Sequence, residues 1–165
     1  MKPWLDRPRE EAYLFNPAFS SNSIAAAIGG YMSVKNEGTP LPLVFMFLPI
    51  TLHRVTRESL PPSVRTSMVM WLQENAIARV LFYERLVSLK PHTREALHFG
   101  LLNDWFLLAE GGLIKTTKTE KEVNKAVQML AEEARECILR ARFVGKWFAL
   151  AGTPQTVMAL WGIQP

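Results

Sequence analysis

The spacing of hydrophobic residues changes within residues 91–117, and this change predicts a helix followed by a β-hairpin. The first residues recur every three or four positions, as on a helix that packs one side against a core. The hydroxyl of Thr93 is placed to cap the start of this helix. A short hydrophobic run, Gly111-Gly112 and a second short run follow, and glycine adopts the positive φ of a two-residue hairpin turn. The helically spaced residues are Leu97, Leu101, Trp105 and Leu108.

Two further helical patterns precede this stretch, at residues 63–73 and 75–89. With the helix from Thr93 and the hairpin, they predict a winged-helix-like module over residues 61–117, in which the hairpin is a small wing. An amphipathic helix, a loop and an unrelated strand also fit this pattern. In a DNA-reading module the outward side of the third helix enters the major groove. Here the basic side chains on that side are balanced by carboxylates, which DNA phosphates would repel. These outward residues are Arg94, Glu95, His98, Asn103 and Asp104.

The N-terminal part of the chain divides into an arm and a helix. Residues 1–12 carry prolines and mixed charges, and they predict an extended arm that Trp4 attaches to the body. Asn16 followed by Pro17 is typical of a helix start, because Asn caps well and proline loses no hydrogen bond at the first position. We therefore expect a helix over residues 17–34.

The next segment is less clear. Residues 36–42 contain a glycine and two prolines and predict a turn. Residues 41–53 are apolar without a clear period, so they fit either a helix or a strand of the core. Their Leu and Met content favours a helix disturbed at Pro49.

A long C-terminal helix is predicted over residues 119–152. Thr119 and Glu122 have the spacing of a capping box, and an apolar seam follows with alternating spacings of four and three. The seam residues are small in the middle, which favours packing against other helices of this chain or a partner helix over a strong zipper. No repeat or linker divides the chain, so we expect one mainly α domain over residues 1–165, a helical domain that contains the winged-helix-like module.

Composition and charge are those of an ordinary globular protein. Hydrophobic residues make up 48% and charged residues 21% of the chain, and the formal net charge is +4. This modest excess favours acidic partners only if it gathers on one face. No segment has the pattern of a signal peptide or a membrane span. The single cysteine, Cys137, forms no internal disulfide, so we expect a cytoplasmic protein without membrane association.

The sequence contains no recognisable catalytic constellation. Neither glycine pair is followed by the lysine and hydroxyl residue of a phosphate loop. His53, His92 and His98 lack a spacing that places two imidazoles on one metal. Cys137 lies on the apolar seam, where a thiol is normally inert. We therefore expect a protein that is not an enzyme and that binds no cofactor or metal.

Basic residues near and after the predicted wing are candidates for contacts with DNA phosphates. Those on the long helix are spaced by seven and four and so share one side. The alternative is a solvated face that forms local ion pairs with Glu132, Glu133 and Glu136. The corresponding alternative function is a stand-alone winged-helix DNA-binding regulator. The candidates are Lys115, Lys118, Arg135, Arg142 and Lys146.

Several segments, in the same order along the chain, resemble a known family. They are RPREEAYLFNPAF (residues 7–19), LPLVFMFLPITLHRVTRESLP (residues 41–61), TREALHFGLL, ARFVGKWFALAG and MALWGIQP. In these segments the chain resembles the middle component of bacterial three-component ABC-type ATPase conflict systems. It is also similar to the small accessory subunit of Lamassu-type anti-phage and anti-plasmid defence systems.

The resemblance implies a small subunit beside a large SMC-like coiled-coil ABC ATPase and an effector, often a nuclease. Hydrolysis and cutting would belong to these partners. We therefore expect a non-catalytic adaptor of a defence complex that links the ATPase to the effector and touches DNA mainly through the complex. The candidate partner interface comprises Trp4, Arg94, His98, Trp147 and Trp161.

Overall fold

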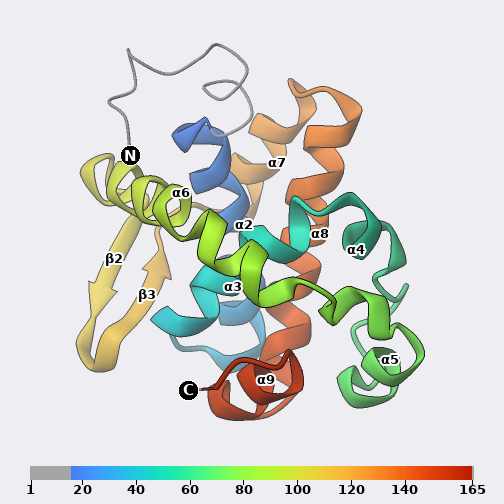
Figure 1. The fold of residues 1–165 in the computed structure, drawn as a ribbon. Helices are drawn as coiled ribbons and strands as arrows, with labels where there is room; N and C mark the ends of the chain where they lie inside the picture. Colours follow the sequence, from blue (N-terminus) through green and yellow to red (C-terminus); the bar gives the residue numbers. More distant parts are fainter. Residues whose placement is uncertain (1–15, 165) are drawn as a thin grey trace.

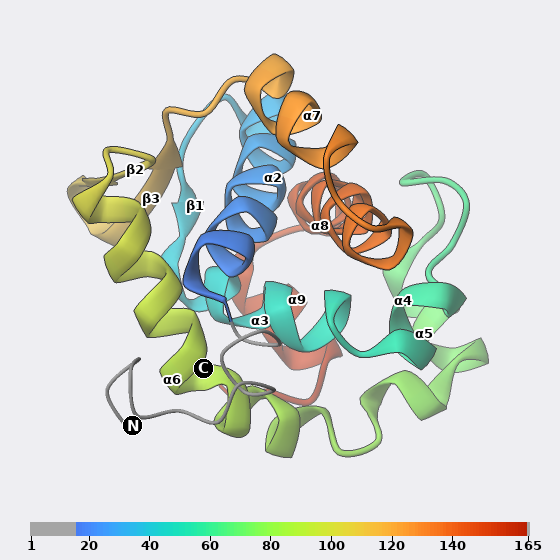
Figure 2. The same ribbon diagram turned by 90° about the horizontal axis from the view of Figure 1, so that it is seen from above.

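Two long helices, α2 (Pro17–Lys35) and α8 (Glu132–Leu150), pack against each other at the centre of the molecule (Figures 1 and 2). The computed structural model describes residues 16–164. Glycines allow the two backbones to touch: a Cβ on Gly145 would overlap the carbonyl oxygen of Ala27, and a Cβ on Gly30 would overlap that of Arg142. Figure 2 shows α2 between α8 and a small sheet.

The predicted N-terminal helix is confirmed. Asn16 caps α2, because its Oδ1 accepts a hydrogen bond of 2.9 Å from the Ala18 N–H. Pro17 occupies the first helical position, where its missing N–H costs nothing. The helix ends at Asn36, which adopts a left-handed conformation at φ 57° and donates its N–H to the Met32 carbonyl.

The ambiguous apolar segment is a helix, α3 (Leu41–Thr51), that contains Pro49. Most of its residues are buried on all sides, which explains why the sequence has no clear period there. It contacts α2, α6 and α8, so it crosses the core. Two short helices follow, α4 (Arg54–Ser59) and α5 (Met68–Glu74), and then a 3-10 helix at Ala76–Arg79.

The next helix, α6 (Phe82–Leu102), runs unbroken through Pro91. Our prediction of two helices, with Thr93 as the cap of the second, is wrong: Thr93 is buried within α6, and its Oγ1 donates to the Leu89 carbonyl over 3.0 Å. Pro91 removes one backbone hydrogen bond. Packing of α6 against α2 and α3 offsets this loss, because tertiary contacts provide most of a helix's stability in a protein.

The predicted hairpin is confirmed as β2 (Phe106–Ala109) and β3 (Leu113–Thr116), which pair antiparallel. Its turn has three residues, Glu110–Gly112, and not the two that were predicted, and both glycines have the predicted positive φ. The helix before the hairpin ends at Leu102. Trp105 and Leu108 are therefore not helical, and the prediction that they are is wrong. Asp104, at φ 58°, turns the chain out of the helix.

A third strand, β1 (Thr39–Pro40), was not predicted. It pairs antiparallel with β3, opposite Ile114 and Leu113, and gives the strand order β1-β3-β2. Two residues are too few to show the alternation that identifies a strand, and the glycine and prolines around them resemble a turn. This part of the chain therefore crosses to the hairpin edge before α3 begins (Figure 2).

These elements correct the helices expected before the wing. Residues 63–67 are not helical, and residues 75–89 divide between the 3-10 helix and the start of α6. Residues 61–117 thus contain two α-helices and one short 3-10 helix in front of the hairpin, with other bounds than predicted. The mainly helical class with a β-hairpin is nevertheless confirmed.

The long C-terminal helix is also divided, into α7 (Glu120–Gln128) and α8, with a break at residues 129–131. The capping box is confirmed: the Thr119 N–H donates to Glu122 Oε2 over 2.8 Å, and the Glu122 N–H donates to Thr119 Oγ1 over 3.3 Å. The break allows α7 to turn across α2 while α8 runs along it (Figure 2). A short helix, α9 (Pro154–Leu160), completes the described fold.

Candidate protein-interaction surfaces

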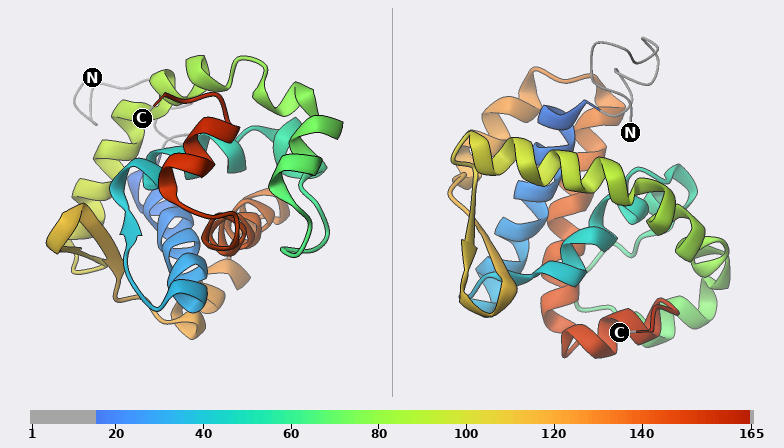
Figure 3. Two further views of the ribbon diagram at one scale, coloured as in Figure 1. Left: turned by 90° about the horizontal axis from the view of Figure 1, so that it is seen from below. Right: turned by 60° about the vertical axis from the view of Figure 1, so that its left-hand side comes forward.

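A strongly apolar groove of about 600 Å³ follows α6. One wall is α6, and the floor comes from α3 and β3. The opposite side comes from Leu108 on the hairpin and from Met158 and Ile163 at the end of the chain. Figure 3 shows how α6 reaches from the hairpin towards α5, with α9 below it. We call this surface the α6 groove.

Three basic or titratable residues lie along the α6 wall of this groove. Lys90, Arg94 and His98 are spaced by four, so one occurs at each helical turn. Among the described residues that line the groove, none is Asp or Glu. Arg94 and His98, two residues of the expected partner interface, are therefore exposed together beside an apolar surface.

The other members of that expected interface lie elsewhere. Trp147 and Trp161 are each 1% exposed and belong to the core. Trp147 Nε1 donates to the Thr66 carbonyl over 2.7 Å. The ring of Trp161 packs 4.7 Å from that of Phe82, centroid to centroid. These rings join α5, α6, α8 and α9, so neither indole is available on the surface. Trp4 lies outside the described residues.

A second group of exposed apolar residues lies near the end of α6 opposite the hairpin. It consists of large hydrophobic side chains on α5, the 3-10 helix and the first turn of α6, and we call it the corner patch. Leu81, 62% exposed, begins α6 in a left-handed conformation at φ 54°. That conformation is costly for a residue with a large side chain. The members of the patch are Met70, Ile77, Val80, Leu81 and Tyr83.

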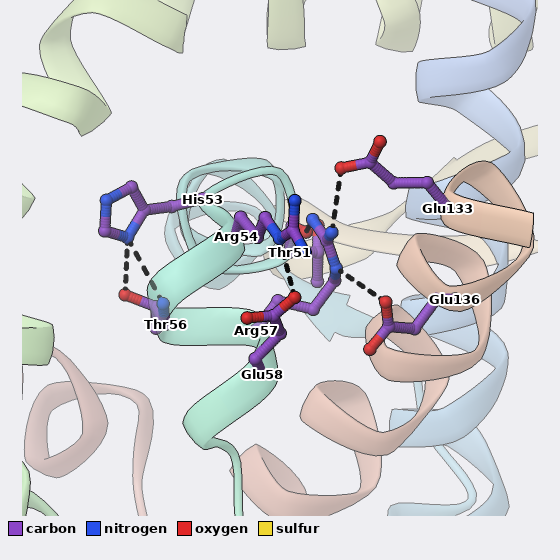
Figure 4. A network of polar contacts seen from close by, with 8 residues as sticks. All are labelled: Thr51, His53, Arg54, Thr56, Arg57, Glu58, Glu133 and Glu136. Atoms are coloured by element: carbon purple, nitrogen blue, oxygen red, sulfur yellow. Dashed lines mark hydrogen bonds and ion pairs between the residues drawn. The ribbon is translucent and has the colours of Figure 1, made fainter.

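Among residues 16–164, the charged side chain that is buried is that of Arg57 on α4 (Figure 4). Its Nη1 donates to the Thr51 carbonyl over 3.0 Å, and its Nη2 donates to Glu133 Oε1 over 3.1 Å. Its Nε lies 3.5 Å from Glu136 Oε2. The guanidinium therefore ties α4 to the first turns of α8. Its two carboxylate partners, Glu133 and Glu136, are 76 and 79 residues distant in sequence, so no local pattern could identify these ion pairs.

Arg57 lines a pocket of about 660 Å³ that also contains His53, Arg85 and Cys137. His53 Nδ1 lies 2.8 Å from Thr56 Oγ1 and accepts the Thr56 N–H at the start of α4 (Figure 4). Burial, and then the charge of Arg85, lower the pKa of His53, so its neutral form is favoured. Burial raises the pKa of the Cys137 thiol, which keeps it protonated at neutral pH.

The candidate phosphate contacts are only partly brought together. Lys118 and Arg142 line one small pocket with Glu120, and Arg142 forms an ion pair with this glutamate. A side-chain hydrogen bond from Arg142 is the main cause that lowers the pKa of Glu120, and Lys146 adds to it. Lys115 is exposed on β3, and Arg135 lies beside the α7–α8 break. The charge of this region is therefore partly neutralised.

Two properties of residues 16–164 concern metal-binding groups and membrane-spanning helices. In this part of the chain, no group of three or more His, Cys, Asp or Glu side chains is arranged to hold a metal ion. None of its helices has both the length and the apolar character needed to cross a membrane.

Fold and surfaces together define a small, mainly helical protein with a β-hairpin and an apolar, basic-walled groove. The chain belongs to the family "ABC-three component (ABC-3C) system Middle Component 3", whose model matches residues 4–165. It is therefore a component of a multi-subunit system, as the resemblance to middle components implied. The similarity to Lamassu-type subunits is not confirmed by this match. No curated protein and no solved structure matches the chain.

Proposed function

We propose that this protein is a non-catalytic adaptor that links an SMC-like ABC ATPase to an effector of the nuclease type in a bacterial defence complex. In the cytoplasm it holds the effector inactive until the complex senses foreign DNA. The observation that carries this proposal is the presence of two exposed apolar surfaces, one along α6 and one around its first turn, in a chain that belongs to a family of middle components.

The division of the exposed apolar residues into two groups suits a linking subunit. α6 has 21 residues, which corresponds to a length of about 30 Å. The corner patch surrounds its first turn, and the α6 groove follows it towards the hairpin. Exposed clusters of large hydrophobic residues mark interaction sites in soluble proteins. The two groups share no residue, so two partners can contact this chain through different residues.

The chemistry of the Arg57 pocket supports a role without catalysis. A nucleophilic cysteine requires a lowered pKa, whereas burial raises that of Cys137. The Nδ1 atom of His53 is engaged at the start of α4, and both hydrogen-bonded terminal nitrogens of Arg57 serve the fold. The titratable groups of this pocket thus act in helix capping and packing.

Reconstitution of the three-subunit complex tests the proposal. We expect the ATPase and the effector that are encoded with this chain to co-purify only when it is present. Its omission should also leave the effector active without DNA. If omission changes neither assembly nor activation, the adaptor role is refuted.

A patch variant tests whether one surface serves one partner. In Met70→Glu/Tyr83→Glu, two charges enter the corner patch while the groove is unchanged. We expect this variant to lose one subunit and to retain the other. Loss of both subunits by a folded variant contradicts the assignment of separate surfaces.

The alternative function, a stand-alone DNA-binding regulator, has weaker support. Its best feature is the cluster of Lys118, Arg142 and Lys146, but Glu120 neutralises part of that charge. Phosphate binding by this cluster would first have to break the Glu120–Arg142 ion pair. The regulator predicts tight, strongly salt-dependent binding of the isolated chain to duplex DNA, which a binding titration measures directly.

A further inference from the structure

We propose that the α6 groove receives an acidic amphipathic helix from a partner subunit. This inference deepens the proposed function and rests on it, because it specifies the chemistry by which one partner is bound. The occupant presents apolar side chains to the groove and carboxylates to its basic wall.

The shape of the groove matches a helix laid along α6. Residues of one face of α6, from Leu86 to Leu101, line the groove at helical spacing, a distance of about 22 Å along the axis. Leu108 and Met158 face this wall from the hairpin and from α9. Packing one helix along another buries such a stripe by fitting side-chain ridges into grooves. A partner helix of about four turns is therefore long enough to follow the full wall.

The charges of the wall specify the occupant's polar side. Lys90 and Arg94 are spaced by four, so their like charges disfavour the isolated helix. Within residues 16–164, neither residue forms an ion pair. Carboxylates spaced by three or four on a partner helix would face Lys90, Arg94 and His98 in turn. They would remove the repulsion and set the register of the bound helix.

The apolar lining favours a protein helix over nucleic acid. Phosphates would match Lys90 and Arg94, but apart from these two and His98 the lining consists of Leu, Met, Phe, Ile and Pro side chains. A sugar–phosphate backbone would lose water against such a surface without gaining hydrogen bonds. An amphipathic helix satisfies both parts of the groove, in the recognition mode of a helix bound by a hydrophobic groove.

Photo-crosslinking in the reconstituted complex identifies the occupant. Benzoylphenylalanine replaces Leu101 in the groove, and in a control it replaces Val69 on α5; these residues are 41% and 45% exposed. After irradiation, we expect the Leu101 probe to label a partner segment with helically spaced Leu, Met or Phe residues and carboxylates three or four positions apart. The Val69 probe should not label that segment.

Several results of this experiment overturn the inference. They are labelling of a basic segment, of a second copy of this chain, or of this chain's own residues 1–15. A complex that assembles with no adduct at Leu101 also overturns it. In each of these cases the adaptor role stands if the ATPase and effector still require this chain to assemble.

A charge-reversal pair provides the quantitative test. Lys90→Glu/Arg94→Glu reverses the wall, and Lys121→Glu/Lys125→Glu makes the same change on exposed positions of α7 with the same spacing. We expect the wall variant to weaken binding of the purified partner subunit about tenfold or more, because opposed charges become like charges. The α7 variant should bind nearly as wild type. Circular dichroism checks that both variants fold.

Two outcomes separate the inference from the proposed function. Unchanged partner binding by the folded wall variant refutes the acidic helix and leaves the adaptor role intact. A wild-type chain that binds neither partner refutes the adaptor role itself. If the wall variant instead loses duplex DNA binding and keeps both partners, the groove binds nucleic acid and the inference is wrong.

Discussion

The helices α2 and α6 have similar lengths, 19 and 21 residues, but they use their surfaces in opposite ways. Ten residues of α2 are buried, because α8, the sheet and α6 surround it. Only five residues of α6 are buried, and much of its apolar side faces the groove or solvent. Apolar spacing on a helix therefore marks a packed surface, but it does not show whether the same chain or a partner supplies the other half.

The largest expected change in stability comes from a substitution at the α2–α8 contact. In Gly145→Ala, the added Cβ overlaps the backbone of Ala27, so we expect the free energy of unfolding to fall by about 3 kcal/mol or more. In Gly29→Ala, the added Cβ meets only Thr116 Cγ2 at 3.8 Å. Here the better helix propensity of Ala should raise that free energy by about 0.5–1 kcal/mol. Urea unfolding measures the free energy of unfolding of both variants. Equal changes would show that α2 and α8 can move apart at Gly145 without loss of stability.

The next effect concerns Arg57, which ties the edge of the molecule to α8. Arg57→Leu removes the donor to Thr51 and leaves Glu133 and Glu136 without their cation, so we expect a loss of about 2–3 kcal/mol in the free energy of unfolding. Arg54→Leu is the matched control on the same helix, because Arg54 forms an exposed pair with Glu58. This control should change little. A large effect of the control alone would contradict the role of the buried tie.

A smaller effect should appear as pH dependence. The pKa of His53 is lowered in the folded protein, so the unfolded chain binds the proton more readily. Its contribution to stability is complete above the unfolded value of about 6.5 and is lost as pH falls through the lower folded value. His53→Asn keeps a capping side chain and should remove this part of the pH dependence. Thermal unfolding of the wild type and of His53→Asn between neutral and mildly acidic pH measures the difference. Identical pH profiles would contradict a contribution of His53 to the pH dependence of stability.

The smallest effect is expected on the exposed side of the groove. Leu108 is 66% exposed, so Leu108→Gln should change the free energy of unfolding by only about 0.5 kcal/mol or less. Its effect on partner binding should be larger, because a polar group enters the apolar side of the groove. Calorimetric unfolding and partner titration measure the two quantities. A large loss of stability would place Leu108 in the core instead.

Local signals in the sequence predicted the elements that depend on neighbouring residues. The Asn16 cap, the Thr119–Glu122 capping box and the Gly111-Gly112 turn each act over a few positions, and all three are confirmed. The predicted helix bounds were wrong where packing between residues far apart in the sequence outweighs local signals. Thr93 was predicted to cap a new helix, yet one helix, α6, runs through Pro91 and Thr93 and packs against α2 and α3.

The candidate surface required the fold. Arg94 and His98 were identified from the sequence, but the apolar residues that make them part of a groove come from α3, the hairpin and the C-terminal end. The same limit explains Trp147 and Trp161, since a tryptophan that suits an interface also suits a core. Burial of these indoles depends on α5, which approaches them from a distant part of the chain.

Pro91 lies in the middle of the groove wall and removes one of its backbone hydrogen bonds. Without an amide hydrogen on Pro91, the Val87 carbonyl lacks its helical donor, so bending of α6 costs least at this turn. Leu86 and Lys90 lie on one side of Pro91, and Arg94 to Leu101 lie on the other. Bending at this turn would change the curvature of the wall to which we propose that a partner helix binds.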